Sequence, residues 1–163
     1  MKVAILSDTH DNIWTLEELL ENVARSGASA LLFCGDLCAP FTLKQIGEGF
    51  DGTVHAVQGN NDGDVQLLLR IAGGLDNVTW HGPFAYLEVD GRQVALNHYP
   101  QIARDQALSG QYDLVCYGHD HTANVERIGT TLLVNPGEAM GRFGKSTYAV
   151  YDTASGEAEL HEV

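Results

Sequence analysis

Short apolar runs alternate with segments of helical periodicity through the first half of the chain. Residues 2–7 form an apolar run of the kind that suits a buried parallel strand. Apolar positions then recur at helical spacing and stop near Gly27, and either Asp11 or Asn12 can cap this helix. The alternation of strands and helices favours a largely parallel sheet with right-handed crossovers. Further strands are predicted at residues 30–34 and 53–57, and further helices at residues 41–46 and 65–72.

From residue 76 onward the pattern changes to strands joined by tight turns. The dipeptide Asp90-Gly91 lies between two alternating segments, which is a strong signal for a β-hairpin. Two more hairpins are predicted, turning at Gly129 and at Ser155-Gly156. No repeat, low-complexity stretch or linker interrupts the chain, so we expect one domain over residues 1–163. Strands are predicted at residues 78–80, 84–89, 93–97 and 114–117, and a helix at residues 101–108.

The composition is that of an ordinary globular protein. The chain has 163 residues, of which 44% are hydrophobic and 19% are charged, unlike a disordered segment. This length suits one domain, since most domains have roughly 100–200 residues. The chain carries 22 acidic against 9 basic residues, a formal net charge of −13. A surface this acidic repels polyanions, so general nucleic-acid binding is disfavoured.

Three further features indicate the compartment in which the protein works. No apolar run approaches the roughly 20 residues that span a bilayer, so no membrane association is expected. The first predicted strand begins almost at residue 1, without the long apolar segment of a secretory signal. The three cysteines form an odd set without the spacing of a metal finger. They fit a reducing, cytoplasmic setting.

Polar residues with metal-binding chemistry follow the predicted strands rather than being scattered over the chain. In open α/β sheets the carboxyl ends of the strands form the ligand crevice. Clusters that are distant in sequence can therefore converge at this edge. The clusters are Ser7-Asp8-Thr9-His10, Gly35-Asp36, Gly59-Asn60-Asn61-Asp62, Asn97-His98 and Gly118-His119-Asp120-His121.

These clusters contain enough ligands for two metal ions. Two carboxylates, one amide oxygen and four imidazoles exceed the needs of a single tetrahedral zinc ion. Two dications about 3.5 Å apart repel by roughly 19 kcal/mol at an effective dielectric of about 20, and a shared carboxylate reduces this repulsion. Asp36, alone after its strand, is the expected bridge. The candidate ligands are Asp8, His10, Asp36, Asn60, His98, His119 and His121.

Each cluster also has a simpler interpretation. An isolated Asp-x-His is more often a helix cap or a turn, and Gly-Asn-Asn-Asp is by itself an ordinary turn. A His-x-His pair can point outward from a turn. Independent turns would not, however, collect four of the seven histidines at strand ends. The combination therefore favours a metal centre.

The ordered motifs resemble those of the calcineurin-like metallophosphoesterase superfamily. Its pattern is Asp-x-His, Gly-Asp, Gly-Asn-(His or Cys)-(Asp or Glu), a lone His and Gly-His-x-His, and this chain has the corresponding blocks in that order. Its length, its early first strand and the segment Asn135-Pro136-Gly137 are similar to the small YfcE-type phosphodiesterases. The vacuolar sorting protein Vps29 shares their fold. The resemblance covers nearly the whole chain.

The resemblance implies a fold, a ligand set and cofactors. The expected fold is of the mixed α/β class, a four-layer αββα sandwich of two mixed β-sheets. The expected cofactors are two divalent metal ions. Manganese is favoured, with iron, zinc or nickel as alternatives, since mixed oxygen and imidazole ligation does not choose among them. Asp8, His10 and His121 would hold the first ion, Asn60, His98 and His119 the second, and Asp36 would bridge both.

The implied activity is hydrolysis of a small phosphodiester, or of a monoester, by a metal-bridging hydroxide that attacks phosphorus. Asp36, Asn61 and His98 are the residues expected to act in catalysis. Relatives often form dimers, which makes a homodimer a further expectation. The alternative is a catalytically weak, Vps29-like scaffold for protein binding. Relatives of that kind have lost key site residues, whereas all seven proposed ligands are present in this chain.

Three positions depart from the superfamily pattern. Asn61 stands where relatives have histidine or cysteine, and an amide supplies no proton at neutral pH. Activity is therefore expected to favour esters with acidic leaving groups. Glu138 replaces the serine that is common after Asn-Pro-Gly. His98 lacks the usual flanking glycines, since Asn97 and Tyr99 are its neighbours.

Overall fold

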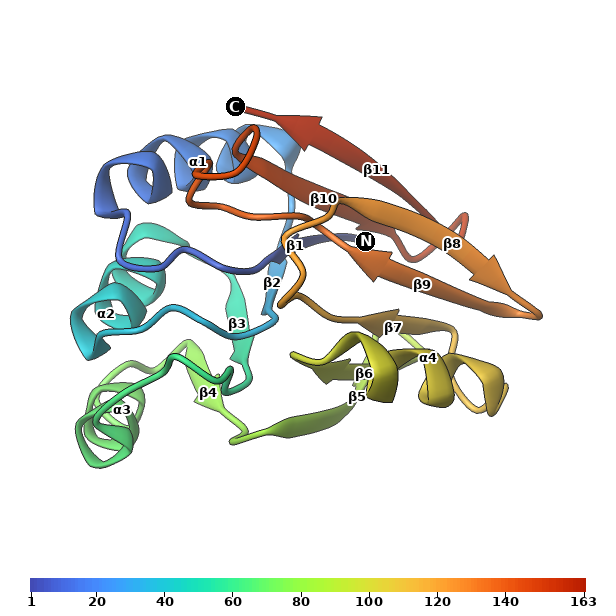
Figure 1. Cartoon of the computed structure of the whole chain (residues 1–163), viewed down its shortest axis with the longest axis horizontal. Helices are drawn as coiled ribbons and strands as arrows, with labels where there is room; N and C mark the ends of the chain where they lie inside the picture. Colours follow the sequence, from blue (N-terminus) through green and yellow to red (C-terminus); the bar gives the residue numbers. More distant parts are fainter.

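The chain forms four helices and eleven strands (Figure 1). The computed structural model describes all 163 residues. None of the helices combines the length and apolar content that crossing a membrane requires. The helices are α1 (Ile13–Ser26), α2 (Pro40–Gly49), α3 (Val65–Ala72) and α4 (Pro100–Leu108). The strands are β1 (Lys2–Leu6), β2 (Ala30–Phe33), β3 (Thr53–Ala56), β4 (Val78–Trp80), β5 (Phe84–Val89), β6 (Arg92–Asn97), β7 (Leu114–Cys116), β8 (Asn124–Ile128), β9 (Thr131–Asn135), β10 (Thr147–Asp152) and β11 (Glu157–Glu162).

The strands form two mixed sheets. The first has the order β11-β10-β1-β2-β3-β4. Its strands β1 to β4 are parallel, as the alternation with helices predicts, and the C-terminal hairpin β10–β11 adds two antiparallel strands beside β1. The second sheet has the order β5-β6-β7-β9-β8, with antiparallel hairpins on either side of β7.

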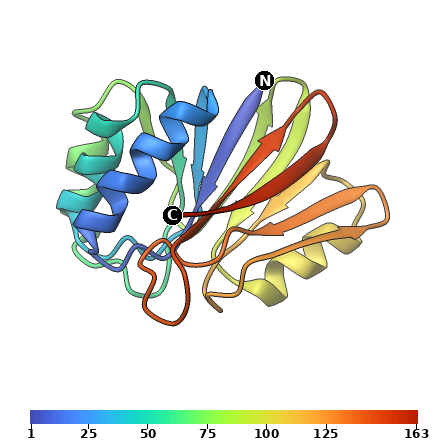
Figure 2. The same ribbon diagram turned by 90° about the horizontal axis from the view of Figure 1, so that it is seen from above.

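Three hydrophobic cores separate four layers. Along β1, Ala4 and Leu6 pack with α1, α2 and α3, whereas Val3 and Ile5 pack between the two sheets. A third core, which includes Val115, joins the outer face of the second sheet to α4. Figure 2 shows the resulting sequence of layers, from α1–α3 through the two sheets to α4. The αββα sandwich implied by the resemblance is confirmed.

The main difference from the predicted elements is the length of α2. The helix predicted at residues 41–46 extends to Gly49, through glycines that weaken a helix. A Cβ atom on Gly47 would lie 2.7 Å from Val78 Cγ2 and 2.8 Å from Leu75 Cδ1. Glycine thus lets α2 pack closely against the start of β4. This tertiary contact outweighs the low helix propensity of glycine.

Asn12 rather than Asp11 caps α1. The Asn12 side chain accepts a hydrogen bond from the Thr15 N–H at 3.3 Å. Asp11 instead accepts hydrogen bonds from the Ala39 N–H at 2.9 Å and from the Thr42 hydroxyl at 2.7 Å. The loop after β1 is therefore tied to the start of α2.

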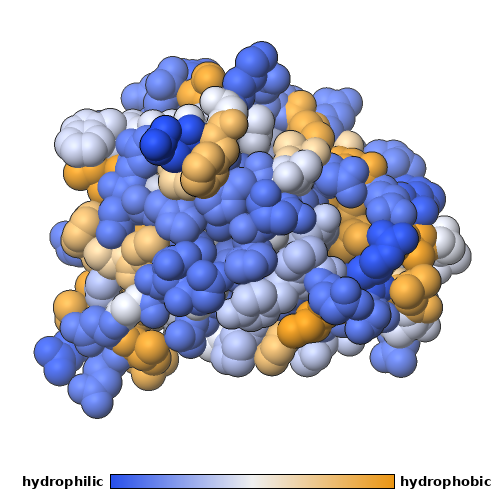
Figure 3. All heavy atoms as spheres, viewed as in Figure 1, coloured by the Kyte–Doolittle hydropathy of each residue, from blue (hydrophilic) through white to orange (hydrophobic).

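The loops that follow β1 and β2 cross the face of the molecule seen in Figure 1. Figure 3 shows hydrophilic side chains across the middle of this face, with apolar groups mainly towards its margins. Parallel strands end at the same edge of a sheet, so polar loops gather there. The predicted metal ligands lie in loops of this kind, after β1, β2, β3, β6 and β7.

Candidate metal centre

All seven predicted ligands lie in loops at one edge of the sandwich, where both sheets contribute strand ends. The loops of the first sheet follow β1, β2 and β3, and those of the second follow β6 and β7. Residues more than a hundred positions apart therefore meet. The first sheet contributes Asp8, His10, Asp36 and Asn60, and the second contributes His98, His119 and His121.

Glycines that precede the ligands allow these loops to approach one another. A Cβ atom on Gly59 would lie 2.5 Å from the Asp36 backbone nitrogen, and one on Gly118 would lie 2.5 Å from Asp8 Oδ2. Such distances are shorter than any side chain tolerates. Glycine is therefore required at both positions for the carboxylates to reach the centre of the site.

The backbone at the site is strained. Left-handed φ angles are rare for residues other than glycine and cost of order 1–3 kcal/mol each. Strain of this kind persists only where the surrounding structure enforces it, and it clusters at functional sites. Five predicted ligands show it: Asp8 (+56°), His10 (+41°), Asp36 (+59°), His119 (+75°) and His121 (+58°).

Asp8, His10 and His121 form the first of two contact groups. The fully buried Asp8 places its Oδ1 atom 3.5 Å from His10 Nε2 and 3.3 Å from His121 Nε2. Its Oδ2 atom accepts a hydrogen bond from the His119 backbone N–H at 3.1 Å, which fixes the carboxylate. The ligand atoms of this group all lie within 4.8 Å of one another. This spacing suits a single metal ion.

Asn60, His98 and His119 form the second contact group. Asn60 Oδ1 lies 3.1 Å from His98 Nε2 and 2.9 Å from His119 Nδ1. His98 is fully buried, whereas Asn60 and His119 are exposed. This group is therefore anchored in the interior and open to solvent on its outer side.

Asp36 lies between the two groups. Its Oδ2 atom lies 3.6 Å from His10 Nε2 and 3.4 Å from His98 Nε2. Burial on its own raises the pKa of Asp36, but hydrogen bonds from His98 and from Asn61 outweigh burial and hold this pKa below its ordinary value. The carboxylate is thus ionised and faces one imidazole of each group.

Three of the imidazoles have a second partner at Nδ1. A partner at this nitrogen fixes the ring and its tautomer, so that the lone pair of Nε2 is directed at a metal. In each of the three rings Nε2 faces a carboxylate. The partners are the Cys34 carbonyl oxygen for His98 (2.8 Å), Glu138 Oε2 for His121 (3.0 Å) and Cys38 Sγ for His10 (3.5 Å).

Two buried atoms at the site, Asp8 Oδ1 and His10 Nε2, have no hydrogen-bond partner. A buried polar atom without a partner costs about 1–3 kcal/mol and is rare. The two atoms lie 3.5 Å apart, and both carry lone pairs when the His10 imidazole is neutral with its proton on Nδ1. A divalent cation would accept both lone pairs, so the residues fit a metal of this class.

Asp62 organises the loops without facing either group. This buried carboxylate accepts hydrogen bonds from the backbone N–H groups of Gly59 at 2.6 Å, Cys38 at 2.8 Å and Asp36 at 3.1 Å. Burial raises the pKa of Asp62, although the three donors act in the opposite direction. It joins the loop after β2 to the loop after β3. The sequence places Asp62 in a turn motif but does not reveal this role.

Cys38 and Glu138 were also missed as partners of predicted ligands. The only available signal was their position, since Cys38 follows Gly35-Asp36 by two residues and Glu138 follows Asn-Pro-Gly. Neither position indicates which histidine the side chain reaches.

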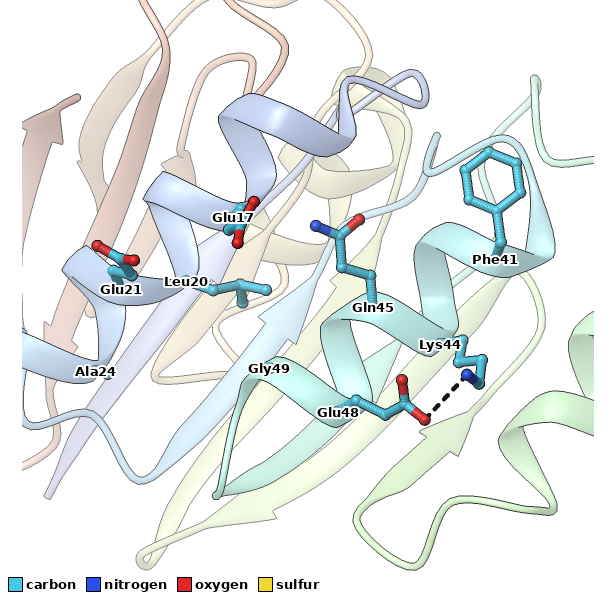
Figure 4. Close-up of a pocket in the computed structure, with 9 residues that line it drawn as sticks. All are labelled: Glu17, Leu20, Glu21, Ala24, Phe41, Lys44, Gln45, Glu48 and Gly49. Carbon is cyan, nitrogen blue, oxygen red and sulfur yellow. Dashed lines mark ion pairs between the residues drawn. The ribbon is translucent and has the colours of Figure 1, made fainter.

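The largest hollow on the surface lies elsewhere. A groove of about 670 Å³ runs between α1 and α2 (Figure 4). Leu20 of α1 lines it, and Lys44 forms an ion pair with Glu48 at 3.1 Å on the α2 side. None of the predicted ligands lines this groove. It is therefore separate from the metal centre.

Known proteins resemble the chain over almost its full length. The sequence pattern of the calcineurin-like phosphoesterase superfamily domain matches residues 1–156. Phosphodiesterase MJ0936 of Methanocaldococcus jannaschii is 31% identical over 160 residues, which cover 96% of each chain. Phosphodiesterase YfcE of Escherichia coli K12 is 28% identical over 151 residues, which cover 84% of this chain and 78% of the relative.

Solved structures share the same arrangement of elements. The structure of an archaeal phosphodiesterase superposes with a TM-score of 0.92 at 29% identity, and each chain is covered completely. Vps29 of Entamoeba histolytica in complex with zinc superposes with a TM-score of 0.71 at 17% identity, covering 100% of this chain and 98% of the other. At 17% identity, the similarity to Vps29 shows only that the two proteins share a fold.

Proposed function

Because the chain belongs to the calcineurin-like phosphoesterase superfamily and is a metal-dependent phosphoesterase, we propose that it hydrolyses phosphodiesters at two divalent metal ions. One observation carries the proposal of two ions: the Oδ2 atom of Asp36 lies close both to His10 Nε2 of the first contact group and to His98 Nε2 of the second. A carboxylate shared by two dications offsets their mutual repulsion.

The contact groups supply the ligands of the proposed ions. Bound there, the ions would polarise the phosphate and lower the pKa of water, so that hydroxide is available as the nucleophile. Manganese is the ion that we propose, following the resemblance to the superfamily, although the mixed oxygen and imidazole ligands suit iron, zinc and nickel as well. We assign Asp8, His10 and His121 to the first ion, Asn60, His98 and His119 to the second, and Asp36 to both.

Asn61 is the side chain that we place closest to the substrate. It is exposed, and its amide donates a hydrogen bond to Asp36 Oδ2 at 2.7 Å. In that position the amide can also orient a phosphate oxygen, but it has no proton to give to a leaving group at neutral pH. The substrates that we propose are therefore phosphodiesters with acidic leaving groups.

The charge of the protein restricts the size of the substrate. Two dications beside Asp8 and Asp36 make the site positive, whereas the protein as a whole has a formal charge of −13. The site would attract one phosphate group, while the acidic surroundings repel a long polyanion. We therefore propose small phosphate esters rather than nucleic acids.

The test is hydrolysis of bis(p-nitrophenyl) phosphate by protein that has been freed of metal with a chelator. Turnover is expected only after Mn²⁺ is added. Replacing Asp36 by Asn (Asp36→Asn) should lower kcat by about 100-fold or more, because the electrostatic contribution of a bound ion amounts to several kcal/mol. Asp76→Asn is the matched control, since Asp76 is exposed and makes no side-chain hydrogen bond.

Two results would overturn the proposal. The first is the absence of turnover with manganese, iron, zinc and nickel alike, which would favour a protein-binding scaffold. The second is unchanged turnover in Asp36→Asn, which would exclude a carboxylate shared by two ions. The Asp76→Asn control separates a general effect of charge from an effect at the site.

A further inference from the structure

Glu138 is a buried carboxylate beside the metal centre, in the loop between β9 and β10. Its side chain is 2% exposed. Oε2 lies 3.0 Å from His121 Nδ1, and Oε1 accepts a hydrogen bond from the Phe143 N–H at 2.6 Å. A buried charge is costly unless it is paired and hydrogen-bonded. Both oxygens of Glu138 are therefore committed to specific partners.

His121 is held between two carboxylates. Its Nδ1 faces Glu138, and its Nε2 lies 3.3 Å from Asp8 Oδ1. A neutral imidazole has one N–H and one lone pair, and a carboxylate only accepts hydrogen bonds. With the proton on Nδ1, donated to Glu138, the lone pair is on Nε2. The Phe143 ring lies beside the imidazole with 5.3 Å between ring centroids.

We propose that Glu138 is a positioning residue for the first metal ion, because it holds His121 in the tautomer and orientation that present Nε2 to that ion. The proposal rests on the ligand assignment made under the proposed function. It goes beyond that assignment because Glu138 is not one of the seven ligands and acts on the metal position only through His121 Nδ1.

Glu138 also gives the two proposed metal positions different histidine partners and therefore different metal affinities. Among the three histidines whose Nε2 faces a carboxylate, only His121 also has a carboxylate at Nδ1. His98 donates to a backbone carbonyl, and His10 lies 3.5 Å from a thiol sulfur. A carboxylate partner increases the basicity of a ligating imidazole, and its loss typically weakens metal binding by about 10–100-fold. Removing the Glu138 carboxylate should therefore weaken metal binding at the first position and leave metal binding at the second unchanged.

The substitution Glu138→Gln separates this role from simple packing. Glutamine has nearly the same volume, and its Oε1 can still accept the hydrogen bond from Phe143. Its NH₂ group would then face His121 Nδ1, which can accept only if the imidazole proton moves to Nε2. That tautomer has no lone pair directed at the metal. The variant should thus keep its fold and lose metal affinity.

The experiment combines calorimetric titration of metal-free protein with Mn²⁺ and long-range ¹H–¹⁵N spectra of the histidine rings. The wild type should bind two Mn²⁺ ions and should show His121 protonated at Nδ1 before metal is added. In Glu138→Gln one binding event should weaken by about 10–100-fold, with the His121 proton on Nε2. Glu159→Gln is the control, because Glu159 is exposed on β11 and makes no side-chain hydrogen bond.

The outcomes separate this inference from the proposed function. If Glu138→Gln binds both ions as the wild type does, with His121 still protonated at Nδ1, the role of Glu138 is refuted and the two-ion enzyme stands. If the wild type binds fewer than two ions, the proposed function fails, and the His121 tautomer alone decides the role of Glu138. Should Glu138→Gln not fold, Glu138→Asp replaces it: the shorter carboxylate should keep the Nδ1 proton, and an Nε2 proton there would refute the role.

Discussion

Most side chains at the metal centre contact two other groups. The second contact fixes the orientation or the protonated atom of the side chain and thereby its chemical role. Asn61 is the clearest case. Its backbone N–H and its side-chain amide both donate to Asp36, at 2.8 Å and 2.7 Å. An imidazole or a thiol at this position would titrate, whereas an amide does not. The consequence is a proposed phosphodiesterase without a general acid beside the leaving group.

The substitution Asn61→His should restore proton donation. A positioned general acid contributes about 10²–10⁴-fold, and its contribution is greatest for poor leaving groups. The wild-type rate should therefore fall steeply as the pKa of the leaving group rises, and the variant should show a shallower dependence. Rates with a series of aryl phosphodiesters measure both slopes.

The control for this series is Asn22→His, on α1 and away from the centre. It should keep the wild-type slope. A wild-type slope that is already shallow and equal to that of Asn61→His would mean that another group supplies the proton.

At the scale of single residues, the sequence indicates which side chains meet at the site but not the partners that orient them. That Asp8, His98 and His121 lie at one edge of the sandwich could be predicted because each belongs to a short motif that follows a strand. Glu138 could not be paired with His121, because that contact forms between two loops whose relative position depends on the packing of the second sheet. The left-handed backbone of the ligands is likewise enforced by contacts that are distant in sequence.

At the scale of helices, strands and turns, most of the fold could be predicted because local signals agree with the final packing. The Asp90-Gly91 turn is an example, since both residues adopt the positive φ angles that a two-residue hairpin requires. The place of the hairpin β10–β11 could not be predicted from pattern alone. The apolar run of β10 and the more polar β11 would suit the edge of either sheet, and only the contact with β1 decides between the two.

Replacing Gly59 by alanine should disrupt the contact between the loops that follow β2 and β3. A Cβ atom at this position would lie 2.5 Å from the Asp36 backbone nitrogen. Such overpacking costs about 1–3 kcal/mol. Since Asp36 itself must move, metal binding should weaken together with stability. Thermal unfolding and Mn²⁺ titration of the variant measure the two effects.

Gly63→Ala is the matched control in the same loop, because a Cβ atom on Gly63 would meet no atom within 4 Å. It should keep wild-type stability and Mn²⁺ affinity. Equal effects of the two substitutions would show that the close approach of Gly59 to Asp36 is not required.

At the scale of the whole molecule, protons and metal ions compete for the same side chains. Asp8 raises the pKa of His10 against the opposing effect of burial. Burial lowers the pKa of His98, but Asp36 outweighs burial and raises this pKa above its ordinary value. Both imidazoles thus hold a proton more tightly in the folded, metal-free protein than in the unfolded chain. Their contribution to stability is complete below the unfolded pKa of about 6.5 and is lost as the pH rises through the raised values.

The rise in Tm caused by Mn²⁺ should therefore grow between pH 5.5 and pH 8. A metal binds only the deprotonated imidazoles, so protons oppose binding most strongly at the acidic end of this range. Burial lowers the pKa values of His55 and His81, which contact each other away from the ligands with 3.0 Å between Nδ1 and Nε2. Their effect on Tm is the same with and without metal, so it cancels in the rise in Tm that Mn²⁺ causes. A rise in Tm that is constant across this pH range would contradict competition at His10 and His98.

The decisive measurement is X-ray diffraction near the manganese absorption edge from crystals grown with Mn²⁺. We predict two anomalous peaks about 3.5 Å apart, one beside Nε2 of His10 and His121 and the other beside His98 and His119, with the Asp36 carboxylate between them. A single peak would contradict this, and so would two peaks that the carboxylate does not join.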